Sequence, residues 1–148
     1  MEPTRQHQEA FWVAGPRVRT TNAEENAPAT MRIGGLWQRF FAEEVYARTP
    51  HRTADDRNFG VYANYESDAA GAFDVIAGVA VSQGGTVQVA AGDYLVFEAH
   101  GEMPQAVLDA WQRIWRYFET HPEIRRSYRS DFEAYTSPTD LTVHIGVE

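Results

Sequence analysis

The residues best suited to chemistry lie together near the end of the chain, in the stretch 130–137. This stretch is rich in aromatic and β-favouring residues and is followed by a proline, a pattern that predicts a strand closed by a turn. Alternate side chains of a strand share a face, so Asp131, Glu133 and Tyr135 are expected on one face and Phe132 on the other. If Phe132 points into the core, Glu133 points either at water or into a cleft. A carboxylate surrounded by aromatic rings suits an apolar cation, which is the ligand that this pattern favours.

Two helices are expected to supply the aromatic walls of such a cleft. A helical period begins near Thr30, which is an acceptable N-cap, and places Trp37 on an apolar stripe. A second period begins at Pro104 and places Trp111 on the corresponding stripe. Core packing is the alternative role for both tryptophans, and it is the role assigned to Trp115. As cleft walls, well-placed rings would each add a cation–π attraction of about 0.5–2 kcal/mol.

Alternating apolar residues predict strands around these helices. An interrupted strand is expected within 9–19, and further strands are expected at 59–65, 73–81, 86–99 with a break at 91–93, and 141–147. The resulting order is βαββ twice over. This order predicts an α+β fold in a single domain, residues 1–148, with one half at about 9–82 and the other at about 86–148.

The two halves also match in sequence. Residues 37–39 and 111–113 both read Trp-Gln-Arg, and Tyr62 takes the place in its strand that Glu133 takes in the second half. A match within two βαββ patterns supports an internal duplication. Two such units can join as one antiparallel sheet with both helices on one face, or as two sheets around a groove. In either case Tyr62 and Glu133 are expected near a pseudo-twofold axis, with a ligand cleft between the halves.

Composition argues against several classes of protein. The 148 residues are 43% hydrophobic, which favours a packed core, and their net charge of −8 argues against direct binding to nucleic acid. There are no cysteines, the five histidines lack a paired spacing, and no phosphate-binding or dinucleotide motif occurs, so neither a metal nor a cofactor is expected. Without a signal peptide or a stretch approaching ~20 apolar residues, a soluble cytoplasmic protein with no membrane association is expected. The basic cluster of Arg125, Arg126 and Arg129 is assigned to a solvated loop.

Five short motifs follow one another along nearly the whole chain, from about Phe11 to Val147. They are Leu-Trp-Gln-Arg-Phe at 36–40, Phe-Gly-Val-Tyr at 59–62, Ala-Gly-Asp-Tyr at 91–94, Trp at 111 with Tyr-Phe at 117–118, and Asp-Phe-Glu-Ala-Tyr at 131–135. In this order they resemble the motifs of the GyrI-like small-molecule-binding domains, also known as the effector-binding domain of bacterial transcription activators. The resemblance implies a tandem βαββ fold with an aromatic cleft and a buried glutamate that recognises lipophilic cations.

Residue by residue, Glu133 matches the family's glutamate, and Trp37 and Tyr62 match aromatic wall positions. The chain has no room for the DNA-binding segments of the full regulators, so a stand-alone member is expected. Stand-alone members include proteins that resemble hydrolases of strained cyclopropane-bearing compounds, and these use the same glutamate.

Two functions therefore stay open. The first is a multidrug sensor or sequestering protein that holds a hydrophobic, cationic or polycyclic ligand between Trp37, Tyr62, Trp111 and Tyr135, with Glu133 as counter-charge. The second is a hydrolase without metal or cofactor, in which Glu133 activates water and Tyr62 or Tyr135 donates a proton. A weaker third possibility is inhibition of a DNA-handling enzyme, and a protein partner or a homodimer is left open. The plain alternative for Glu133 is a solvated strand face.

Overall fold

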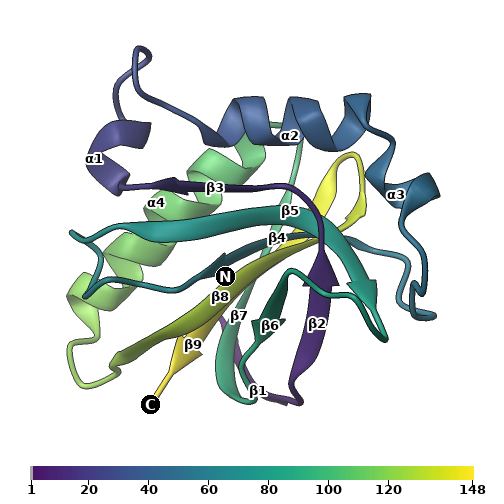
Figure 1. Ribbon diagram of the computed structural model, residues 1–148. Coiled ribbons are helices and arrows are strands. Elements are labelled where there is room, and N and C mark those ends of the chain that lie inside the picture. The colour runs from purple at the N-terminus through teal and green to yellow at the C-terminus, as the bar shows by residue number, and fades with distance from the viewer. Residues whose placement is uncertain (1) are drawn as a thin grey trace.

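The computed structural model describes residues 2–148, which form an α+β fold around one antiparallel sheet of nine strands (Figure 1). The strands are β1 (Thr4–Gln8), β2 (Phe11–Ala14), β3 (Arg17–Thr20), β4 (Asn58–Ala63), β5 (Phe73–Val81), β6 (Val87–Val89), β7 (Gly92–His100), β8 (Arg126–Ser137) and β9 (Asp140–Val147). The helices are α1 (Asn22–Glu25), α2 (Ile33–Ala42), α3 (Val45–Arg48) and α4 (Gln105–Thr120). The order across the sheet is β1-β7-β9-β8-β4-β5-β2-β6, and β3 also pairs with β5.

The two long helices pack on the same face of this sheet, one on each half. Leu36 and Phe40 of α2 lie against the inward side chains of β5, while Ala110 and Ile114 of α4 lie against β7 and β9. Figure 1 shows α2 running along β3 and β5, while α4 contacts β7 in the other half of the sheet. Trp111 packs against both clusters and therefore joins the two halves. Of the two arrangements left open by the sequence, the structure has the single sheet with both helices on one face.

The opposite face of the sheet carries a second apolar core. Phe59, Val61 and Phe132 point to this side and meet Val13 of β2 and Val89 of β6. Strand β6 approaches β4 and β8, so the end of the sheet curls over its own centre. The central strands β4, β5 and β8 are therefore covered on both sides, which explains why β5 is buried along its whole length.

Most predicted elements are confirmed, with differences at their ends. Strand β5 covers the predicted residues, and α4 begins after Pro104 and ends before His121. The predicted break between β6 and β7 is present but falls at residues 90–91, because Gly92 and Asp93 already belong to β7. Strand β1 was not expected, because its sequence is polar and exposed throughout most of its length. Alternation along the predicted strand 59–65 would place Tyr65 on the face of Phe59. Instead β4 ends at Ala63, and Tyr65 packs on the helix side because Asn64 adopts φ 53° and turns the chain over.

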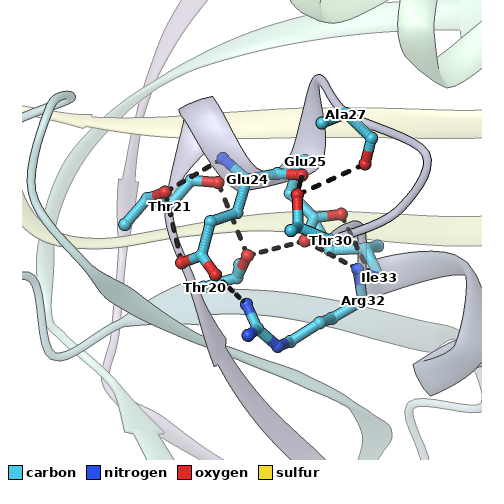
Figure 2. A network of polar contacts seen from close by, with 8 residues as sticks. All are labelled: Thr20, Thr21, Glu24, Glu25, Ala27, Thr30, Arg32 and Ile33. Atoms are coloured by element: carbon cyan, nitrogen blue, oxygen red, sulfur yellow. Dashed lines mark hydrogen bonds and ion pairs between the residues drawn. The ribbon is translucent and has the colours of Figure 1, made fainter.

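The predicted N-cap at Thr30 is wrong. Helix α2 starts at Ile33, and its first amides are satisfied by a carboxylate from the preceding short helix. Glu25 accepts hydrogen bonds from the backbone N–H of Arg32 at 2.8 Å and of Ile33 at 3.1 Å, and from the Thr20 hydroxyl at 2.6 Å (Figure 2). A carboxylate at this position also interacts favourably with the positive end of the helix dipole. Glu25 thereby ties α2 to β3.

Within residues 2–148, no helix is both long and apolar enough to cross a lipid bilayer.

Candidate ligand-binding site

Glu133 lies at the centre of the sheet face that the two helices cover. The pairing of the strands places one row of residues across this face, in the order Phe97, Val143, Glu133, Gly60 and Ala77. The carboxylate thus stands between the apolar clusters under α2 and α4. Its residue is only 2% exposed, so the alternative of a solvated strand face is wrong.

Three neutral donors bind the carboxylate of Glu133. The Tyr62 hydroxyl donates to Oε2 at 2.7 Å, and the Trp111 indole N–H donates to the same oxygen at 2.8 Å. The Tyr135 hydroxyl donates to Oε1 at 2.8 Å. Tyr62 comes from β4, Trp111 from α4 and Tyr135 from the same strand as Glu133. Hydrogen bonds to an ionised acceptor are the stronger kind, so this arrangement holds the carboxylate in one orientation.

Aromatic rings complete the walls on both sides. The Trp37 and Tyr135 rings meet edge to face with their centroids 5.3 Å apart, and the Tyr62 and Trp111 rings are 5.2 Å apart. Each helix therefore contributes one tryptophan, and each tryptophan packs on a tyrosine that binds Glu133. The structure brings together all five residues that the sequence singled out.

Burial dominates the protonation behaviour of these groups. Loss of solvation raises the pKa of Glu133 above its ordinary value, while the hydrogen bonds from Trp111, Tyr62 and Tyr135 act in the opposite direction. Burial beside that carboxylate raises the pKa of Tyr62 and of Tyr135 well above 10. Both hydroxyls therefore stay protonated as donors. The site can hold one negative charge, and a positive charge close to it would stabilise the ionised carboxylate.

Gly60 is a residue of the candidate site that the sequence reasoning missed. It pairs with Glu133 across β4 and β8, and a Cβ placed on it would lie 2.9 Å from Oε1 of Glu133 and 3.1 Å from the Trp37 ring. Only a residue without a side chain leaves room for both groups in their present positions. The glycine was visible in the Phe-Gly-Val-Tyr motif, but its role depends on the strand register that sets it opposite Glu133.

A second carboxylate on the same face is neutralised within the protein. Asp131 is fully buried, forms an ion pair with Arg126 at 2.7 Å, and accepts hydrogen bonds from the Tyr65 hydroxyl and from the Gly146 backbone N–H. The Arg126 side chain is only 9% exposed and lies over the Tyr128 ring. The assignment of Arg126 to a solvated loop is therefore wrong, because β8 begins at this residue.

In the described part of the chain, no three His, Asp or Glu side chains come together as metal ligands.

Fold and site together define the class of the protein: it has the GyrI-like effector-binding fold, with a buried glutamate beneath two aromatic helices. The chain belongs to the Cass2 family of integron-associated effector binding proteins, whose profile matches residues 6–147. The integron cassette protein VCH_CASS2 from the mobile metagenome of Vibrio cholerae is 38% identical, with a TM-score of 0.84, over 99% of this chain and 96% of that one.

The fold also recurs at lower sequence identity. SAV2435, whose structure was solved bound to tetraphenylphosphonium, is 20% identical with a TM-score of 0.81, over 100% of this chain and 94% of that one. At this identity the likeness concerns the fold alone. No curated protein matches the sequence.

Proposed function

We propose that this protein binds lipophilic cations at Glu133, as a multidrug sensor or a sequestering protein. The observation that carries the proposal is a buried carboxylate with neutral partners only. Among residues 2–148, no Arg or His forms an ion pair with Glu133, whereas Asp131 on the same face has Arg126. A buried charge without a counter-charge is costly, and a bound cation would supply one.

The chemistry of the walls selects the kind of cation. Tyr62, Trp111 and Tyr135 already direct their donors at the carboxylate, so a ligand does not need N–H groups of its own to be held. A delocalised or shielded cation can approach through the ring faces and gain cation–π attraction of about 0.5–2 kcal/mol. Tetraphenylphosphonium, the ligand of SAV2435, has this chemistry.

A ligand of this size must displace part of the cover. Glu133 is 2% exposed, and Trp37 and Trp111 are half-buried above it. We therefore expect one or both indole rings to move when a cation binds, and tryptophan fluorescence to report the event.

The experiment compares a cation with a neutral molecule of similar shape. Tetraphenylphosphonium and triphenylphosphine oxide are titrated into the wild type, into Glu133→Gln and into Glu98→Gln, which removes an exposed carboxylate from β7. We expect Glu133→Gln to lower the affinity for the cation by about tenfold or more and the affinity for the neutral molecule only slightly. Glu98→Gln should change neither affinity. Equal losses for both ligands would count against the proposal.

The hydrolase is the second candidate, and the raised pKa of Glu133 is what favours it. A carboxylate with a raised pKa is a better proton acceptor, and Tyr62 stays protonated beside it. The hydrogen bonds from three protein groups weaken this candidate, because they occupy the oxygens that would accept a proton from water. Turnover of a strained cyclopropane compound that stops in Glu133→Gln while binding survives would favour the enzyme.

A further inference from the structure

Large apolar side chains are exposed on the two helices beside the site. Phe41 of α2 is 64% exposed, and Leu108 and Trp115 of α4 are 53% and 39% exposed. The prediction that Trp115 belongs to the core is therefore wrong. An exposed apolar patch that continues a buried cluster often marks a ligand-binding groove or an interaction site.

These side chains continue the walls of the Glu133 site outward. The Phe41 ring lies 6.2 Å from the Trp37 ring, and the Trp115 ring lies 6.3 Å from the Trp111 ring. In each helix the outer aromatic residue follows the inner tryptophan by four residues, so it lies on the same flank. The offset of 74 that relates Trp37 to Trp111 also relates Phe41 to Trp115, so both halves carry the same inner and outer pair.

One position breaks this correspondence and leaves space. The same offset relates Leu108 to Gly34, at the first turn of α2. A Cβ placed on Gly34, or on its neighbour Gly35, would meet no atom within 4 Å. The surface of α2 is therefore open at Gly34, where the matching position of α4 carries an exposed leucine.

We propose that Phe41 and Trp115 form an outer tier of the same ligand site and make it selective for cations with several aromatic rings. The inner tier, Trp37 and Trp111 over Glu133, would take the charged centre, and the outer tier would cover rings that extend beyond it. This inference rests on the proposed cation binding at Glu133. The ligand, rather than a second copy of the chain, is chosen as the occupant because the exposed rings are in contact with the rings that cover the buried carboxylate.

The test uses two cations of different extent on matched variants. Tetraphenylphosphonium carries four rings and benzyltrimethylammonium carries one, and both have a permanent charge. Their affinities are measured by calorimetry for the wild type, Phe41→Ala, Trp115→Ala and Glu133→Gln. Tyr46→Ala is the control, because Tyr46 is an aromatic residue on α3 that is as exposed as Trp115 and packs against the Arg52 guanidinium.

We expect Phe41→Ala and Trp115→Ala each to lower the affinity for tetraphenylphosphonium by about tenfold. The affinity for benzyltrimethylammonium should fall by less than about twofold. Tyr46→Ala should leave both affinities unchanged. Loss of binding in Glu133→Gln with full binding in both outer variants overturns the outer tier and leaves the proposed function standing. A wild type that binds neither cation overturns both.

Sedimentation of the same variants tests the other occupant. We expect the wild type, Phe41→Ala and Trp115→Ala to have the same mass in solution. A dimer that dissociates in either variant would show that a second copy covers these rings, and would overturn the proposal.

Discussion

Asp131 and Glu133 lie two residues apart on the same face of β8, and among residues 2–148 only Asp131 has a cationic partner. Arg126 neutralises Asp131 at 2.7 Å, whereas Glu133 is held by two tyrosine hydroxyls and an indole N–H. Both carboxylates are buried to nearly the same extent. One strand thus carries a carboxylate whose counter-charge is built in and a second whose counter-charge we assign to the ligand.

The ion pair leads to a prediction about stability. Arg126→Met removes the partner of a fully buried carboxylate, and we expect a loss of about 3–5 kcal/mol in the free energy of unfolding, measured with urea. Adding Asp131→Asn to this variant removes the unpaired charge and should restore part of the loss. A single variant as stable as the wild type would show that the pair contributes nothing to folding.

Gly60 leads to a prediction about the shape of the site. Gly60→Ala places a methyl group 2.9 Å from Oε1 of Glu133, so the carboxylate or the Trp37 ring must move. We expect a cost of about 1–3 kcal/mol in stability and a weaker affinity for tetraphenylphosphonium. Gly34→Ala is the matched control: its methyl group meets nothing, and a helical alanine should add about 0.5–1 kcal/mol of stability. Unchanged affinity in Gly60→Ala would show that the contact is unimportant for binding.

His144 leads to a prediction about acid stability. It lies on the face opposite Glu133, stacks on the Phe132 ring at 4.2 Å, and has its pKa lowered from 6.5 to about 4, first by burial and then by the charge of Arg57. The unfolded chain therefore binds a proton more readily than the folded one. Stability that is present above pH 6.5 is lost as the pH falls toward about 4, by up to about 3 kcal/mol.

The measurement is the free energy of unfolding at several pH values in this window. His144→Gln keeps a polar group for Thr142 and should flatten the dependence. An equally steep dependence in His144→Gln would assign the effect to other groups.

The sequence predicts the elements of this fold better than their contacts. The period of α4 and the alternation of β5 are local patterns, and both elements lie where the sequence places them. The register that sets Gly60 opposite Glu133 joins strands 73 residues apart in the chain, and no local pattern specifies it. The cap of α2 by Glu25 was missed for the same reason, because it depends on how an irregular loop returns to the helix.

The candidate site was predicted as a set of residues, without its hydrogen bonds. Trp37 and Trp111 follow from helical periodicity, and Glu133 and Tyr135 from strand alternation. Trp115 belongs to the same periodic stripe, but it lies on its outer flank, beyond the edge of the core. Periodicity alone does not distinguish these two positions, since the distinction depends on how far the sheet extends beneath the helix.

The most direct test of the central claim is the pH dependence of tetraphenylphosphonium binding. The charge of this ligand does not change with pH, so any change in affinity reports the protein. Under the proposed function, the cation binds to ionised Glu133, whose pKa burial raises above the ordinary 4.5. We therefore expect the affinity to rise as the pH rises through that pKa and then to level off. Glu133→Gln should bind weakly and show no such rise. An affinity that is independent of pH in the wild type, or a rise that persists in Glu133→Gln, would contradict the assignment of Glu133 as the counter-charge.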